Sequence, residues 1–200
     1  MNTIVGFCTN TGIIIKASDK SPNFDYDYVQ IKLDGNHARD TDEGDIMLVS
    51  KGDINTILNF RWYLNSGGYP STYGTFDKEI KFSRPVPCHQ ILFGNLKKGY
   101  VVDHINRNRL DNRRENLRVC TSKQNSYNRK KPKNSNNRFK GVVKTGPKDN
   151  PRYTASVTKD GQKYEIKDIP NEVQAAKVHD MIAEQLFGTY AAKNFPDKVR

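Results

Sequence analysis

The chain has 200 residues, and only 35% of them are hydrophobic. This composition excludes one large hydrophobic core and favours two or three small folding units. No apolar run approaches the roughly 20 residues that a membrane span needs, and the N-terminus lacks the basic start of a signal peptide, so we expect a cytoplasmic protein with no membrane partner. The three cysteines are widely spaced, which argues against a disulfide framework or a zinc ribbon.

The net charge of +11 is unevenly distributed along the sequence. Residues 1–84 contain 9 Lys and Arg against 11 Asp and Glu, whereas the rest of the chain contains 24 against 11. A concentrated basic stretch is the electrostatic footprint of a protein that binds a polyanion. A solvated basic segment without a partner is the alternative that charge alone leaves open.

Residues 1–84 are predicted to be rich in β-strands. Short apolar or alternating runs predict strands at 13–15, 28–33 and 46–49, with turns at 9–12 and at Asp34-Gly35. Asp53 can cap a short helix that reaches Phe60. Residues 61–64 and 69 onward, separated by Asn65-Ser66-Gly67-Gly68, are typical of a hairpin. No residue in this region has an evident chemical role.

Residues 99–131 predict a strand, a loop, a second strand and a helix. The first strand ends in the polar pair Asp103 and His104, and the second covers 116–120. Thr121 and Gln124 form a capping-box pattern, so a helix is expected from Ser122 to about residue 131, where Pro132 approaches. This ββα unit and the β-rich region before it make up the first predicted domain, residues 1–131.

A polar linker at 132–137 leads to a second predicted domain, residues 138–197. Strands are expected at 139–144, 153–158 and 163–167, with a hairpin turn at Asp160-Gly161. A helix is expected to open at Pro170 and Asn171, to present one apolar face, and to end at Gly188. The predicted fold class is therefore α+β, and its last part is a three-stranded antiparallel sheet packed on one helix.

The ββα unit brings together the residues that could carry chemistry. A carboxylate from Asp103 and an amide oxygen from Asn125 can together hold a hard cation such as Mg²⁺, which retains water and accepts phosphate oxygens. A neutral His104 beside that cation can deprotonate water for attack on phosphorus. Each of these residues alone would more often be a surface or turn residue, and the argument rests on their combination and spacing.

The same residues resemble the HNH (ββα-metal) endonucleases of the bacteriophage homing type. The resemblance rests on Asp103-His104, Glu115-Asn116-Leu117-Arg118 and Gln124-Asn125, with Asn in the third motif position rather than His. It implies that Asp103 and Asn125 bind Mg²⁺ or Mn²⁺, that His104 is the general base and that Asn116 orients it. The neighbouring basic side chains expected to contact DNA are Arg107, Arg109, Arg129 and Lys130.

The C-terminal region resembles the ethylene-response-factor (APETALA-type) DNA-binding domain over residues 137–196. The residues that carry this resemblance are Asn137 to Val142, Tyr153, Ala155, Glu172, Ala175-Ala176, His179-Asp180, Phe187-Gly188 and Asn194-Phe195. In that family the sheet enters the major groove of DNA. The matching outward positions expected to contact DNA are Lys144, Thr154, Ser156, Thr158 and Lys163.

The sequence thus predicts a monomeric, metal-dependent homing endonuclease that nicks or cuts double-stranded DNA in the cytoplasm of a phage-infected host cell. A non-cleaving DNA-binding regulator that keeps a nuclease-derived fold is the main alternative, and an RNA-binding protein is another. His89 could contact phosphate or could be packed in the protein, and His179 is expected in or beside the C-terminal core. A zinc site from Cys88, His89 and Cys120 has no supporting ligand spacing.

Overall fold

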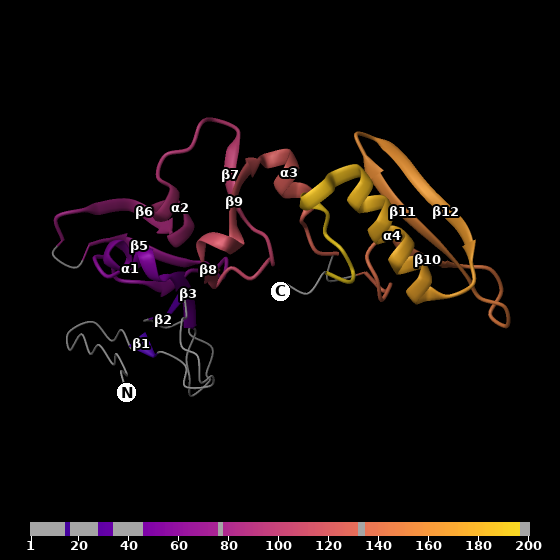
Figure 1. Cartoon of the computed structure of the whole chain (residues 1–200), viewed down its shortest axis with the longest axis horizontal. Coiled ribbons are helices and arrows are strands. Elements are labelled where there is room, and N and C mark those ends of the chain that lie inside the picture. Colours follow the sequence, from indigo (N-terminus) through magenta and orange to yellow (C-terminus); the bar gives the residue numbers. More distant parts are fainter. Residues whose placement is uncertain (1–14, 17–27, 34–45, 76–77, 132–134, 197–200) are drawn as a thin grey trace. The chain divides into compact units, whose positions relative to one another are not determined.

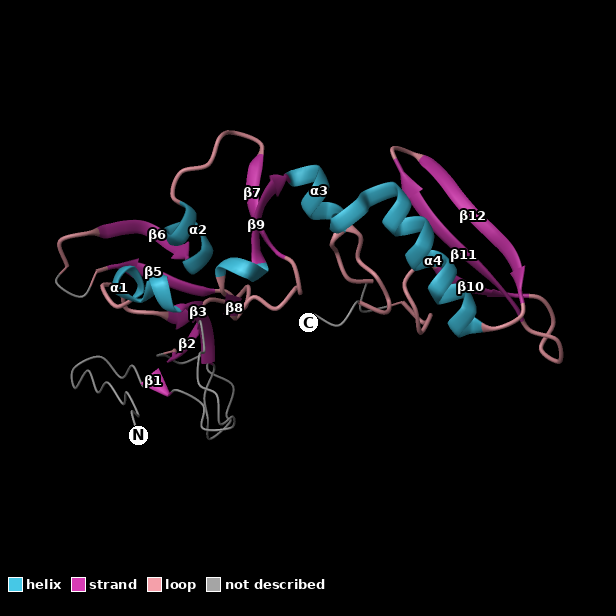
Figure 2. Ribbon diagram, viewed as in Figure 1, coloured by secondary structure: helices cyan, strands magenta, loops and turns pink. Residues whose placement is uncertain are grey.

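The computed structural model describes residues 15–16, 28–33, 46–75, 78–131 and 135–196 (Figure 1). The chain forms two compact units, Met1–Cys120 and Thr121–Arg200. Both units contain helices and small sheets (Figure 2), which confirms the predicted α+β class. In the part of the chain that the structure describes, no helix is long and apolar enough to cross a membrane.

The first sheet of the first unit joins its N-terminal strands to the loop between the two strands of the ββα unit. Its order is β1 (Ile15–Lys16), β2 (Tyr28–Lys32), β3 (Ile46–Ser50) and β8 (Asp111–Asn112). The β8 strand runs parallel to β3 and comes from a segment about sixty residues further along the chain. The strands expected at 28–33 and 46–49 are confirmed; the turns at 9–12 and 34–35 and residues 13–14 lie outside the described residues.

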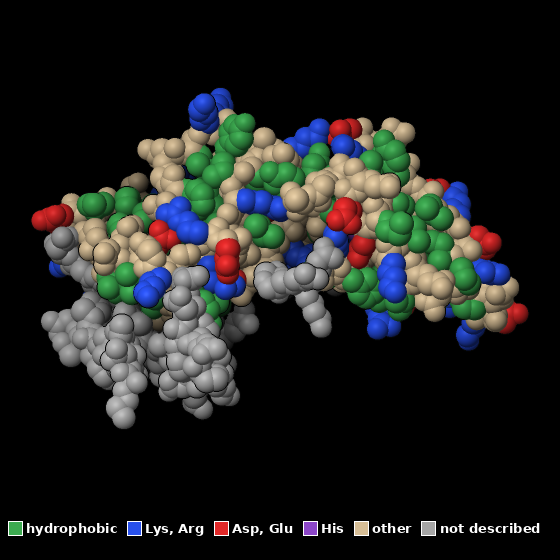
Figure 3. Space-filling view, in the orientation of Figure 1, with side chains coloured by type: hydrophobic (Ala, Val, Ile, Leu, Met, Phe, Trp, Pro, Cys, Tyr) green, Lys and Arg blue, Asp and Glu red, His purple; other side chains and the backbone are tan. Residues whose placement is uncertain are grey.

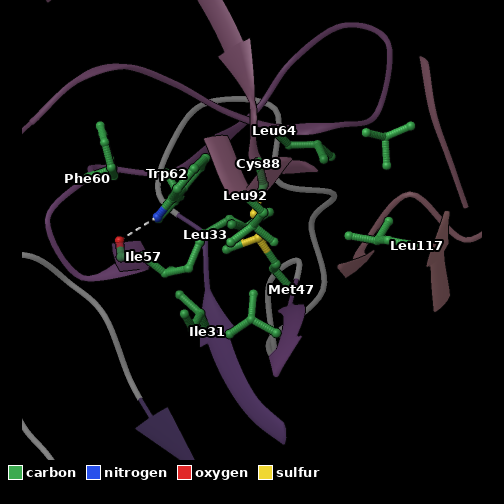
Figure 4. Packing of buried hydrophobic residues seen from close by; sticks show 12 residues of the cluster. Ile31, Leu33, Met47, Ile57, Phe60, Trp62, Leu64, Cys88, Leu92 and Leu117 are labelled. Carbon is green, nitrogen blue, oxygen red and sulfur yellow. Dashed lines mark hydrogen bonds between the residues drawn. The ribbon is translucent and has the colours of Figure 1, made fainter. Parts of the chain in front are cut away.

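A second sheet in the same unit contains the predicted hairpin. It consists of β4 (Tyr63–Leu64), β5 (Pro70–Gly74) and β6 (Lys81–Pro87), which are antiparallel, and α2 (Cys88–Phe93) follows it. Trp62 is buried at the centre of the core, where its Nε1 donates to the carbonyl of Ile57 at 2.8 Å (Figure 4). This hydrogen bond satisfies the indole N–H that burial would otherwise leave without a partner.

The short helix expected after Asp53 is present as α1 (Ile54–Ile57), directly after η1 (Lys51–Asp53). It ends three residues before the expected Phe60, and the expected cap is wrong. The Asp53 side chain makes no capping hydrogen bond. Its two carboxylate oxygens instead accept from the guanidinium of Arg114, each at 2.8 Å. A bidentate pair with a guanidinium is stronger than a hydrogen bond to a backbone amide, so the distant partner replaces the local one.

The ββα elements are found as predicted, except that the helix is shorter. They are β7 (Tyr100–His104), η2 (Arg114–Asn116), β9 (Leu117–Thr121) and α3 (Ser122–Tyr127). The capping box of Thr121 and Gln124 is complete. The helix ends four residues before the expected position. After its end, Lys140 Nζ donates to the carbonyls of Tyr127 and Arg129, at 3.4 and 2.8 Å.

The second unit has the predicted sheet and helix. Its strands β10 (Val142–Thr145), β11 (Arg152–Lys159) and β12 (Gln162–Ile169) are antiparallel, and α4 (Glu172–Phe187) and η3 (Gly188–Tyr190) follow them. Asp160 and Gly161 both have positive φ, at 54° and 81°, as the predicted tight turn requires. The Asn171 side chain caps α4 by accepting from the amides of Val173 and Gln174.

A partly buried polar network fixes the start of β10 against α4. Asn194 Oδ1 accepts from the Lys140 amide at 2.7 Å, and its Nδ2 donates to the Lys140 carbonyl at 3.1 Å. Gly141 has φ 67°, and a Cβ there would lie 2.2 Å from Cδ2 of His179. The strand expected from residue 139 therefore begins only at Val142, since the two residues before it are held by this network.

Candidate active site

The two polar residues at the end of β7 are both buried, with 7% of Asp103 and 6% of His104 exposed. Arg118, on the neighbouring strand β9, donates to Asp103 Oδ2 through Nη2 at 2.7 Å and Nε at 3.0 Å. The carboxylate is thus oriented by a guanidinium, which offsets part of the cost of burying its charge. The predicted Asp-His pair therefore lies at a strand end with its carboxylate already fixed in direction.

The orientation of the His104 ring is set by Asn112. The Asn112 Nδ2 donates to the carbonyl of Arg109 at 3.1 Å, so its Oδ1 faces His104 Nε2 at 3.3 Å. Because an amide oxygen only accepts, this geometry requires Nε2 of His104 to carry the proton. In the neutral ring the basic lone pair is then on Nδ1.

Two further rings pack against His104. The His89 imidazole lies edge-on to it with a centroid separation of 5.1 Å, and the Tyr69 ring lies 6.0 Å away. The guanidinium of Arg109 sits 4.5 Å above the Tyr69 ring. His89 is therefore packed in this cluster, which is one of the two roles that the sequence left open for it.

Burial keeps both imidazoles of the cluster neutral. It lowers the pKa of His104 below its ordinary value of 6.5, although the hydrogen bond with Asn112 opposes this effect. Burial, followed by the neighbouring His104, lowers the pKa of His89 to about 4. A neutral His104 is in the protonation state that a general base needs near neutral pH.

The loop between the two strands is held by Asp111 and Asn116. Burial alone would raise the pKa of the Asp111 carboxyl, but the hydrogen bonds and charge of Arg113 hold it below its usual range. Asn116 Oδ1 accepts from the Asn106 amide at 2.9 Å, and its Nδ2 donates to the Asp111 carbonyl at 2.7 Å. Asn116 thus fixes the loop, and the amide of Asn112 faces the His104 ring. The role expected of Asn116 in orienting His104 stays a prediction.

Sequence reasoning missed Asn112 because Asn116 lies in the family motif and Asn112 does not. The predicted loop contains several asparagines, and nothing in their spacing shows which of them faces the imidazole. The parallel pairing of β8 with β3 buries Asn112 completely and directs it to His104.

The remaining predicted residues of the ββα unit have varied surroundings. Asn125 is the fourth residue of α3 and is half-buried. Arg107 is half-buried with φ 64°, and Arg109 is exposed over Tyr69. Arg129 and Lys130 are exposed after the end of α3. Asn125 and these two basic residues belong to the second unit.

The two metal ligands expected from the sequence are oxygen donors, Asp103 in the first unit and Asn125 in the second. Within the described ranges, no group of three or more His, Cys, Asp or Glu could hold a metal ion. Oxygen ligands of this kind are what a hard cation such as Mg²⁺ prefers, so the expected ligand pair stays a prediction.

The outer face of the second unit's sheet contains a shallow groove. Thr154, Ser156 and Lys163, all predicted DNA contacts, line it. Thr158 lies directly opposite Lys163 in the sheet register. Lys144 does not share this face, because it lies opposite Tyr153 and alternates with Val143 and Thr145, which line the groove.

The groove contains charged residues that sequence reasoning missed. Arg152 lines it and lies 3.4 Å from Asp168, while Glu165 is paired with Lys163 and Lys167. Arg152 could have been found, since it continues the alternation of residues 154, 156 and 158 by one step. In the view of Figure 3, Lys and Arg side chains are scattered over the surface rather than gathered in one patch.

Comparisons with known proteins identify the family. Residues 90–127 match a family model described as HNH endonuclease. An uncharacterized HNH endonuclease of Acanthamoeba polyphaga mimivirus is 37% identical over 153 residues, which cover 76% of each chain. Protein 3.8 of Escherichia phage T7 is 34% identical over 74 residues, covering 37% of this chain and 60% of that protein. No solved structure matches.

The long viral match extends well beyond the motif, and the motif residues Asp103 and His104 lie at the strand end described above. On this evidence the chain belongs to the HNH endonuclease family, whose members cut DNA.

Proposed function

We propose that the chain hydrolyses phosphodiester bonds in double-stranded DNA with one divalent cation, Mg²⁺ or Mn²⁺, held by Asp103 and Asn125. The observation that carries this proposal is the buried, neutral His104 imidazole, fixed by Asn112 and directly following a carboxylate. HNH nucleases generally use a divalent metal. When bound, the cation would stabilise negative charge on the phosphate and the leaving oxygen.

The chain's own residues would act on the water and on the DNA. His104 Nδ1 takes a proton from the attacking water, while Asn112 keeps the opposite nitrogen protonated and the ring in place. Arg118 holds the Asp103 carboxylate in one orientation. Arg107, Arg109, Arg129 and Lys130 would contact phosphates, which fix the register of the protein on DNA without reading its sequence.

The second unit would provide preference for a site. Its sheet face, with Thr154, Ser156, Thr158 and Lys163, has the hydroxyl and ammonium groups that can contact base edges in a groove. The resemblance of residues 137–196 to ethylene-response-factor domains supports this assignment. Lys144 would contribute through phosphate contact from the other face. A nuclease with an additional unit that recognises a DNA site would act as a homing enzyme in the cytoplasm of an infected host cell.

The chain carries one such set of catalytic residues, so we expect a monomer to nick one strand in each binding event. A supercoiled plasmid incubated with protein and Mg²⁺ should yield the nicked circle before the linear form. Asp103→Ala should lose cleavage more completely than Asn125→Ala, because a charged carboxylate contributes more to a hard cation than an amide does. Undiminished cleavage in excess EDTA would rule out the metal-dependent reaction.

One observation favours a second function, a DNA-binding regulator that does not cut. The ion pair of Arg118 with Asp103 already compensates the carboxylate that the proposal assigns to the cation. A protein that binds DNA tightly but never nicks the plasmid with Mg²⁺ or Mn²⁺ would support this alternative. Nicking that disappears in Asp103→Ala and in His104→Ala would exclude it.

A further inference from the structure

A groove with basic and aromatic walls lies over the sheet of β4, β5 and β6 in the first unit, and the proposed function gives it no role. Its walls include the rings of Tyr63, Tyr73 and Phe82 and the cations Arg61, Lys78 and Lys81. Among the described residues that line it there is no carboxylate. The groove thus combines positive charge with aromatic surface, the combination that proteins use to hold a nucleic-acid strand.

The aromatic part is a preformed platform. Tyr73 is 56% exposed, and its ring is stacked on Tyr63 with centroids 5.5 Å apart and planes inclined by 10°. Tyr63 is half-buried and therefore restrains the ring above it. A ring that is already fixed loses little conformational freedom when a base stacks on it.

The two lysines are held beside this platform by contacts between the end of β5 and the start of β6. Gly74 pairs with Lys81 at a bulge, and a Cβ on Gly74 would lie only 2.0 Å from the Ile80 carbonyl oxygen. The Thr75 hydroxyl accepts from the Ile80 amide at 3.1 Å. Only glycine permits this close approach, which brings the lysine-bearing segment against the strand that carries Tyr73.

The platform follows a residue of the catalytic cluster closely in the sequence. Tyr69, which packs on His104, immediately precedes β5, and Tyr73 is four residues later in that strand. At about 3.3 Å for each residue, the two tyrosines are about 13 Å apart. At about 3.4 Å for each nucleotide step of B-DNA, this distance corresponds to about four nucleotides.

We propose that this groove binds a strand of the DNA substrate about four nucleotides from the cut phosphate. Arg61, Lys78 and Lys81 contact its phosphates, and an unstacked base lies on Tyr73. The inference rests on the proposed function and extends it by adding a DNA contact outside both the catalytic motif and the second unit. A nuclease that bends or opens its substrate gains from a platform that receives the displaced base.

Binding should be measured in the full chain with His104→Ala as the parent, so that the DNA stays intact. The probes are two labelled duplexes that differ only in one unpaired nucleotide. Tyr73→Leu should weaken binding of the unpaired-base duplex by about tenfold and change binding of the perfect duplex much less. The double variant Lys78→Ala/Lys81→Ala should weaken both and reduce the slope of log affinity against log salt by about two.

The matched controls are Tyr100→Leu, an exposed tyrosine outside the groove, and Lys97→Ala/Lys98→Ala. Parental affinity and salt slope in both groove variants would overturn the proposal, and so would equal losses in the controls. An equal effect of Tyr73→Leu on the two duplexes would overturn the stacked base. A plasmid-nicking assay of the wild type tests the proposed function separately, since groove variants can lose affinity whether or not the wild type cuts.

Discussion

Each unit contains a histidine next to an aspartate, and the structure uses the two pairs differently. In the second unit His179 Nδ1 and Asp180 Oδ1 contact one another at 2.9 Å. Asp180 also accepts from the amides of Asn194 and Phe195, each at 2.8 Å. In the first unit the neighbours point to different partners, Asp103 to Arg118 and His104 to Asn112.

The comparison shows why one pair stabilises the fold and the other can do chemistry. Burial alone would raise the pKa of Asp180, but His179 and the two backbone amides hold it low, so its charge serves to fix Asn194 and Phe195 to α4. The His104 ring instead faces the amide of Asn112, and burial lowers its pKa so that it stays neutral. An adjacent His and Asp therefore do not define a site by themselves. The hydrogen-bond partners of the two side chains decide their role.

The largest effect is expected for His104→Ala, which should slow plasmid nicking by about 10²–10⁴-fold while DNA affinity changes little. His179→Ala should behave in the opposite way, with a lower melting temperature and unchanged nicking for each folded molecule. Single-turnover nicking and thermal melts of both variants test the contrast. If His179→Ala slowed nicking as much as His104→Ala, the two pairs would not differ as described.

Gly141→Ala should destabilise the second unit by about 2 kcal/mol or more, because the new methyl group meets both a positive φ and the His179 ring. Gly161→Ala is the matched control, since Gly161 also has a positive φ but open space around it, and should cost only about 1 kcal/mol. Chemical denaturation of both variants gives the difference. Equal losses would show that the packing of His179 against β10 contributes nothing.

Asn112→Ala should slow nicking by about tenfold, since the His104 ring loses the partner that fixes its orientation and tautomer. The same variant should shift the pH profile to lower pH, because the hydrogen bond with Asn112 raises the His104 pKa. Asn116→Ala should instead lower the melting temperature without moving the profile. A profile that moves in Asn116→Ala and stays fixed in Asn112→Ala would reverse the two assignments.

The wild-type pH profile should be nearly flat from pH 7 to 8 and should fall on the acid side. His104 acts as a base only when neutral, and burial places its pKa below 6.5, so protonation removes activity only under more acidic conditions. Single-turnover rates at constant ionic strength measure this dependence. A rate that still rises steeply between pH 7 and 8 would mean that another group limits the reaction.

The smallest effect concerns the two faces of the second unit's sheet. Arg152→Ala should weaken DNA binding several-fold and reduce the salt slope by about one, because Arg152 lines the groove. Lys144→Ala, on the opposite face, should have a smaller effect. Gel-shift titrations at two salt concentrations compare them. A larger loss for Lys144→Ala would place the DNA on the other face.

Local signals in the sequence predicted most elements correctly. The capping box of Thr121 and Gln124, the Asp160-Gly161 turn and the Asn171 cap all act within a few residues, so their outcome depends little on the rest of the fold. The cap expected of Asp53 failed because its partner, Arg114, is 61 residues away. No local pattern encodes such a contact.

For the candidate site too, the sequence indicated the residues of the local motif but not those positioned by distant strands. The motif identified Asp103 and His104, and the structure buries both at the end of one strand. It could not identify Asn112, whose direction depends on the pairing of β8 with β3, nor the platform on Tyr73. The face of Lys144 was an avoidable error, because strict alternation along β10 would have placed Val143 and Thr145 outward instead.

The parallel pairing of β3 with β8 limits which segment of this chain could be transferred to another protein by recombination. The recognisable motif covers residues 90–127, but its loop is anchored by β3, by the Ser50 hydroxyl on the Arg114 amide and by Asp53 on the Arg114 side chain. A recombination event that transferred the motif alone would leave β8 without a neighbouring strand and Asn112 without its fixed direction. A transferred segment would therefore have to begin at residue 46, so that it includes β3 together with the motif.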